Sequence, residues 1–160
     1  MAEATVGAIH RILLCILLIG LGGLAIELLL LQHDEEATQL IPLVLIGVAF
    51  LAVAWHAVRP SEASVRSVQV TMVMFIAAGL LGVYLHYQAN AEFQREVDPS
   101  IAGRALFWKA MTAKTPPALA PGSMVQLGLI GLAYTFGYPL RQRATTGPAS
   151  GRGGRQEKIT

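Results

Sequence analysis

Residues 12–31 form a run of twenty side chains that are all apolar or glycine except for Glu27. A helix of about 20 residues rises about 30 Å, which is the thickness of the hydrocarbon core of a bilayer. The run therefore predicts a membrane-spanning helix. A carboxylate inside such a helix is costly and needs a partner, so Glu27 is the first candidate for a functional residue.

The whole chain is too apolar for a soluble domain. Of its 160 residues, 54% are hydrophobic and 14% are charged, and the mean hydropathy is +0.54, so the bilayer must cover much of the folded surface. The net charge of +2 is too small to indicate a nucleic-acid partner. The single cysteine, Cys15, excludes an intrachain disulfide and a metal site built from several cysteines.

Three further apolar runs follow the first, which predicts an all-α integral membrane protein with a bundle of four transmembrane helices. Pro42 fits the first turn of the second helix, because the first amides of a helix have no partner within it. Serines before the third helix can cap it, and Ser123 is the expected cap of the last. We place the four helices at about residues 8–32, 40–58, 67–89 and 123–140.

The connection between the third and fourth predicted spans is the longest in the chain. Connections of this length usually carry function or contain structure of their own. The Asp-Pro-Ser sequence of residues 98–100 predicts a turn into a short helix at about residues 100–113. We expect this helix to lie in the membrane interface, with Phe107 and Trp108 in the headgroup zone. The prolines of residues 115–122 then predict a stiff, extended strap.

The distribution of Lys and Arg predicts the orientation of the spans. Eight of the 12 lie on the side of the N-terminus and four on the opposite side, which places both termini in the cytoplasm and the protein in the cell membrane. Residues 1–143 then form the four-helix transmembrane domain, and residues 144–160 a disordered, basic cytoplasmic tail. A signal peptide cleaved after about residue 25 is the alternative for the N-terminus, although the apolar run is longer than the usual signal sequence.

Small residues recur at helical spacing on three of the predicted spans. They allow transmembrane helices to approach closely, so each stripe predicts a packing seam. We expect the stripe of the first span to face the stripe of the third. The stripes are Gly20, Gly23 and Glu27 on the first span, Gly79, Gly82 and His86 on the third, and Gly128 and Gly131 on the last.

Glu27 and His86 lie near the outer ends of their predicted spans and could therefore meet. A carboxylate shielded from water either pairs or takes up a proton, so this intramembrane pair could hold or pass a proton or bind a cation. The alternative interpretation is structural: the two residues lock the helices together, or each reaches separately to the nearby interface.

The outer connection carries a second set of candidates. Glu92 and Glu96 are one helical turn apart and, with Asp98 and His86, could bind a cation. Together with Trp108 the same segment could instead form a surface for another protein. The plainest interpretation is a solvated helix extension with local ion pairs.

Histidines near the ends of the spans raise the possibility of bis-histidine haem ligation in a four-helix bundle. The predicted topology places His10 with His56 at the inner end and His33 with His86 at the outer end. The alternative is that each is an ordinary interfacial histidine.

Three classes of function follow from these candidates. The first is an accessory, assembly or interaction subunit that binds other membrane protein subunits or further copies of itself; the glycine stripes favour it. The second is a proton- or cation-coupled transport component that uses Glu27 and His86. The third is a haem- or quinone-linked redox protein. The sequence carries no phosphate-binding glycine loop, HExxH or GxSxG motif, so we expect no enzyme, no metal and no cofactor.

Overall fold

The computed structural model describes residues 2–31, 39–113 and 119–136, and these residues are helical apart from short turns. Three of the helices, α1 to α3, are long and apolar enough to cross a membrane. The described residues therefore confirm the all-helical fold expected from the sequence, and the three apolar helices suggest insertion into a membrane. The helices are α1 (Ala2–Leu30), α2 (Leu40–Val58), α3 (Glu62–Val97), α4 (Gly103–Met111) and α5 (Leu119–Thr135).

The predicted bounds of α2 agree with the structure, whereas α1 and α3 are longer than predicted. α1 begins at Ala2 instead of residue 8, and α3 runs from Glu62 to Val97 instead of 67–89. At its start, α3 has the expected serine cap: the Ser61 hydroxyl accepts from the Ser64 amide at 3.1 Å, and the Ser64 hydroxyl accepts from the Ser61 amide at 2.9 Å. The helix continues past the apolar residues because the residues that follow are good helix formers.

The prediction for the start of α5 was wrong. α5 begins at Leu119, not after a cap at Ser123. Pro121 lies in the first turn, where its missing N–H costs no helical hydrogen bond. Ser123 is inside the helix, and its hydroxyl donates to the Leu119 carbonyl oxygen at 3.0 Å. The strap predicted for residues 115–122 is therefore helical from Leu119; residues 114–118, like the predicted tail 144–160, lie outside the described residues.

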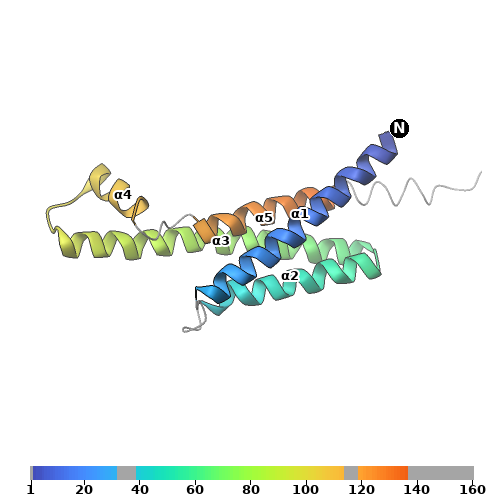
Figure 1. Cartoon of the computed structure of the whole chain (residues 1–160), viewed down its shortest axis with the longest axis horizontal. Coiled ribbons are helices and arrows are strands. Elements are labelled where there is room, and N and C mark those ends of the chain that lie inside the picture. Colours follow the sequence, from blue (N-terminus) through green and yellow to red (C-terminus); the bar gives the residue numbers. More distant parts are fainter. Residues whose placement is uncertain (1, 32–38, 114–118, 137–160) are drawn as a thin grey trace, which may run out of the picture.

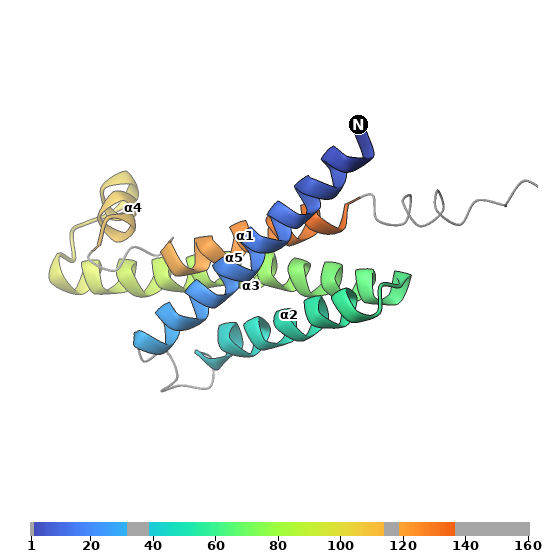
Figure 2. The same cartoon turned by 45° about the vertical axis from the view of Figure 1, so that its right-hand side comes forward.

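α5 packs between α1 and α3, so the predicted seam between the first and third spans does not form as expected. α5 and α2 lie on different sides of the N-terminal part of α3, and α1 crosses over α5 (Figures 1 and 2). A Cβ at Gly79 of α3 would stand 2.6 Å from the Pro121 carbonyl oxygen, and one at Gly128 of α5 would stand 2.7 Å from the Met72 carbonyl oxygen. The glycines of both helices thus lie at one close seam.

Of the other predicted packing glycines, all but one lie at a contact with another helix. Gly82 faces Pro121, Gly131 faces Met72, and Gly20 of α1 faces Leu127 of α5. Gly23 has open space where a side chain would be, so the α1 stripe contacts α5 through only one of its two glycines.

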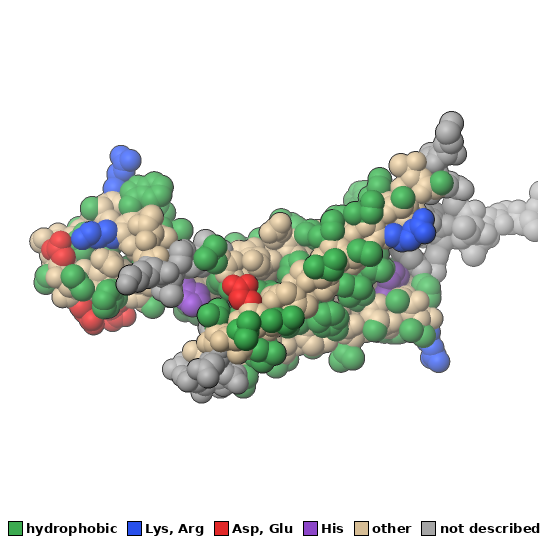
Figure 3. Space-filling model, viewed as in Figure 1, with side chains coloured by type: hydrophobic (Ala, Val, Ile, Leu, Met, Phe, Trp, Pro, Cys, Tyr) green, Lys and Arg blue, Asp and Glu red, His purple; other side chains and the backbone are tan. Residues whose placement is uncertain are grey.

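The main core lies where α1, α2, α3 and α5 meet. Leucines that are three or four residues apart on α1 pack against the inner faces of the other helices, and Phe75 and Met72 of α3 are completely buried. Hydrophobic side chains also cover much of the outer surface around the middle of the molecule, whereas most charged side chains lie near its ends (Figure 3). The α1 members of the core are Leu17, Leu21, Leu24 and Leu28.

The far end of α3 extends beyond the other long helices, and α4 folds back on it (Figures 1 and 2). With 36 residues, α3 is about 54 Å long, whereas about 20 residues cross the hydrocarbon core. Ala91, Leu106 and Ala110 form a second, small core there, and the Asn90 side chain donates to the Ala110 carbonyl oxygen at 3.1 Å. We call residues 87–111 the α3–α4 projection.

Candidate functional site

Glu27 borders a groove between α1 and α5. The groove has a volume of about 220 Å³, and its polar lining consists of Glu27, Ser123 and Gln126 among apolar side chains and Gly20. Glu27 is exposed, and within the described part of the chain its carboxylate has no ion pair and no side-chain hydrogen bond. The carboxylate is therefore open to a donor that comes from outside the described residues.

The pairing of Glu27 with His86 stays a prediction. No hydrogen bond or ion pair joins them among the described residues, and His86 is exposed on α3. α1 packs mainly against α5, with a smaller contact to α2, so α5 occupies the place that the prediction gave to α3.

The acidic candidates of the outer connection all lie on or beside the α3–α4 projection. Glu92 and Glu96 are exposed on α3. Asp98 forms the predicted turn: one of its carboxylate oxygens accepts from the Ser100 hydroxyl at 2.6 Å and from the Ser100 amide at 3.1 Å. These bonds lower the pKa of the Asp98 carboxyl, the hydroxyl bond contributing most. Among the described residues, no three His, Cys, Asp or Glu side chains gather as metal ligands would.

Aromatic side chains form a short stack on the α3–α4 projection. The Tyr87 and Phe107 ring centroids are 5.8 Å apart, and those of Phe107 and Trp108 are 5.5 Å apart, which is the range of favourable aromatic pairs. Trp108 nevertheless remains 58% exposed, and Phe93 on α3 is 59% exposed. The projection therefore has an internally packed side and an exposed apolar surface.

The opposite end of the bundle holds a polar cluster in which the sequence analysis had identified the two histidines but not the tyrosine. Tyr134 of α5 contacts two imidazole rings edge-on, with centroid distances of 6.2 Å to His10 of α1 and 5.9 Å to His56 of α2. His10 and His56 thus share one end of the molecule, as the haem hypothesis required, but both contact a tyrosine ring. His33, the other predicted haem residue, lies outside the described residues.

Hydrogen bonds fix how both histidines of this cluster are held. The buried His56 Nδ1 lies 3.0 Å from the Ser64 hydroxyl oxygen. That hydroxyl already donates to the Ser61 carbonyl oxygen at 2.9 Å, so it accepts from a protonated Nδ1 of His56. His10 Nδ1 donates in the same way to the Val6 carbonyl oxygen at 2.9 Å. The His56 bond ties α2 to the start of α3 in an environment where an unpaired polar group would be costly.

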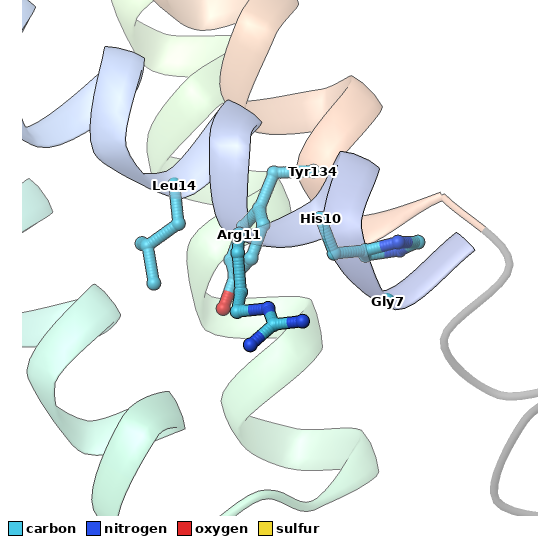
Figure 4. Close-up of a pocket in the computed structure, with 5 residues that line it drawn as sticks. All are labelled: Gly7, His10, Arg11, Leu14 and Tyr134. Carbon is cyan, nitrogen blue, oxygen red and sulfur yellow. The ribbon is translucent and has the colours of Figure 1, made fainter. Parts of the chain in front are cut away.

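Beside this cluster is an open pocket of about 410 Å³. Gly7, His10, Arg11 and Leu14 of α1 line it together with Tyr134 of α5. Figure 4 shows the Arg11 and Tyr134 side chains extending in the same direction, whereas the imidazole of His10 turns aside toward Gly7. The pocket therefore combines one cation, one imidazole and one phenol with Gly7 and Leu14.

Comparison with known proteins gives this chain no relative. No protein family, curated protein or solved structure matches it. The function proposed below therefore rests on the residues of the chain itself.

Proposed function

We propose that this protein is a multi-pass membrane protein that acts as an accessory, assembly or interaction subunit of a larger membrane complex, and not as an enzyme. In this proposal α1, α2, α3 and α5 are its four spans in the cell membrane. In this proposal both termini lie in the cytoplasm, an orientation that the distribution of Lys and Arg along the sequence favours. The partners are the lipid bilayer and either other membrane subunits or further copies of the chain.

The observation that carries this proposal is the α3–α4 projection. Its internal contacts make it a folded helical hairpin, because Ala91, Leu106 and Ala110 are buried between its two helices. Its outer surface exposes 59% of Phe93, 65% of Val97 and 58% of Trp108. Exposed aromatic and aliphatic side chains on a preorganised element are typical of a protein contact surface. In this topology the surface stands outside the hydrocarbon core on the extracytoplasmic side.

The groove at Glu27 supports the same proposal. A carboxylate on a membrane-spanning helix is costly unless a donor satisfies it, and the described residues of this chain offer Glu27 none. Ser123 and Gln126 add further polar groups beside it. A helix from a neighbouring subunit that carries a hydrogen-bond donor or a cation would fit this groove.

The test is to extract the full chain from its native membrane in mild detergent and to identify what migrates with it. We expect a stable larger complex whose recovery falls for the variants Phe93→Ala and Trp108→Ala. The matched control is Leu51→Ala, because Leu51 is 72% exposed on α2, away from the projection. A protein that migrates alone as a homogeneous species, or equal recovery for all three variants, would contradict the contact surface.

Proton- or cation-coupled transport is the second candidate, and the polar lining of the α1–α5 groove favours it. Three polar side chains, Glu27, Ser123 and Gln126, share one groove that is open to the outside of the bundle. If transport is the function, flux into proteoliposomes is lost in Glu27→Gln. A haem-linked function at His10 and His56 would be established by a Soret band from the purified protein.

A further inference from the structure

The pocket at Arg11 lies where the chain enters the hydrocarbon core. Arg11 directly precedes the apolar run that begins at Ile12, so its guanidinium is at the depth of lipid headgroups. Arg11 is exposed. Among the side chains that the structure describes, no carboxylate forms an ion pair with it. The pocket therefore holds a cation whose counter-ion the described part of the chain does not provide.

The chemistry of the lining matches a phosphate group. A guanidinium presents several N–H donors in a planar fork that fits two oxygens of a phosphate, with stronger hydrogen bonds than neutral donors form. The phenol of Tyr134 extends from α5 in the same direction as Arg11 (Figure 4) and brings a hydroxyl group to the same pocket. Leu14 gives the pocket an apolar wall on the side of the membrane, where an acyl chain would continue from a headgroup.

Gly7 keeps the pocket open. A Cβ at this position would meet no atom within 4 Å, although Gly7 lies one helical turn before Arg11 on the same face of α1. A larger side chain at position 7 would occupy part of the pocket that Gly7 and Arg11 both line. The absence of a side chain at this position, in a helix where glycine is unfavourable, leaves room beside the cation.

We propose that Arg11, Tyr134 and Gly7 form a phosphate-binding site at the membrane surface, which accepts the phosphate of an anionic phospholipid headgroup or a free phosphate ion. The end of the bundle that carries it also has Arg59 and Arg66, with Glu62 between them. The excess of positive charge at this end of the bundle attracts anions, and the pocket supplies the specific contact. This site is independent of the partner subunit, since it lies at the end of the bundle opposite the α3–α4 projection.

The lipid arm of the test uses the full chain in nanodiscs that contain equal amounts of phosphatidylcholine and phosphatidylglycerol. Native mass spectrometry then counts the lipids that the protein retains. We expect a preference for phosphatidylglycerol that falls about tenfold in Arg11→Gln, the effect of losing one charge-assisted pair. Arg59→Gln is the matched control, because Arg59 is exposed at the same end but does not line the pocket.

A second variant tests the pocket without removing any donor. Gly7→Leu adds volume where the structure has space and improves helix propensity, so it should fold and still lose the lipid preference. Gly47→Leu is its control, since a Cβ there also meets nothing within 4 Å. Two results would overturn the proposal: equal losses of the phosphatidylglycerol preference in Arg11→Gln and Arg59→Gln, or an unchanged preference in Gly7→Leu. Either result would indicate a general effect of surface charge.

A second experiment determines whether the bound phosphate belongs to a lipid headgroup or is a free phosphate ion. It compares thermal unfolding of the detergent-solubilised protein in sodium phosphate and in sodium chloride of the same ionic strength. A stabilisation by phosphate that disappears in Arg11→Gln, without any lipid preference, identifies the free ion as the ligand. A lipid preference without this stabilisation identifies the headgroup. If Arg11→Gln changes neither the lipid preference nor the stabilisation by phosphate, the site is refuted.

Discussion

Gly79 of α3 lies so close to Pro121 of α5 that a methyl group at Gly79 would stand 2.6 Å from the Pro121 carbonyl oxygen. The same methyl group would be 3.0 Å from the backbone nitrogen of Val125. Backbone atoms of a packed helix cannot move aside as the end of a long side chain can. The distance between α3 and α5 is therefore set by the lack of a side chain at Gly79.

We expect Gly79→Ala to destabilise the protein by about 1–3 kcal/mol, the usual cost of overpacking. Thermal unfolding in detergent measures the effect. Gly47→Ala is the control, because a Cβ at Gly47 meets nothing within 4 Å and alanine is the better helix former, so its stability should be equal or higher. Similar unfolding temperatures for Gly79→Ala and Gly47→Ala would show that α3 and α5 do not pack this closely.

Ser64 joins the cap of α3 to the buried imidazole of His56. Ser64→Ala removes the acceptor for His56 Nδ1–H and half of the capping box, so we expect a loss of about 1–3 kcal/mol in stability. Hydrogen exchange should show the loss at the turn between α2 and α3. In Ser67→Ala, where the backbone carbonyl of residue 67 still accepts from Thr71, exchange at this turn should be unchanged. A turn that exchanges equally in both variants would contradict the proposed role of the His56 contact.

Asp98 provides a pH dependence outside the membrane-spanning part. Its pKa lies below the ordinary value of 3.8, chiefly because the Ser100 hydroxyl donates to the carboxylate. A lowered pKa means that the turn is stabilised above the ordinary pKa and loses this contribution as the pH falls through the value in the folded protein. Ser100→Ala should therefore raise the pKa of Asp98, as measured by NMR titration. A pKa of Asp98 that does not change in this variant would show that the hydroxyl bond does not form.

Glu27→Gln separates the functions proposed for the α1–α5 groove. Because Glu27 has no ion pair among the described residues, the isolated protein should be as stable as the wild type or more stable, since a charge on a spanning helix is costly. Recovery of the complex should fall, because the partner loses a charged acceptor. Glu62→Gln, at the other end of the bundle, should leave recovery unchanged. A large loss of stability in isolated Glu27→Gln would show that Glu27 has a partner within the chain.

Hydropathy predicted where the chain is apolar, but not where each helix ends. α2 agreed with its prediction because polar residues and Pro60 follow directly after its apolar run. α3 continues to Val97, since the polar residues after its apolar part still favour a helix. α5 begins before its apolar run because Pro121 is tolerated in a first turn. The apolar run marks the length inside the bilayer, whereas propensity and capping decide the length of the helix.

Prediction of the candidate sites from the sequence had a similar limit. Glycine spacing identified surfaces of close approach on α3 and α5 at Gly79 and Gly128, yet periodicity within one helix does not state which helix covers it. The predicted pairing of Glu27 with His86 depended on which helices are neighbours, and periodicity within one helix does not give this. Tyr134 was not singled out, because a tyrosine near a helix end is ordinary in membrane proteins; its importance follows only from the crossing of α1 over α5.

The position of α5 between α1 and α3 has a consequence for how the protein is made. Gly79 and Gly82 are covered by α5, which the ribosome produces after the other four helices. While α1 to α3 are being made this face of α3 is still bare, and α1 lacks its main neighbour until α5 follows. A chain that stops before α5 would expose both surfaces to proteases and to unrelated helices, so quality control can distinguish copies with and without α5 by a single helix.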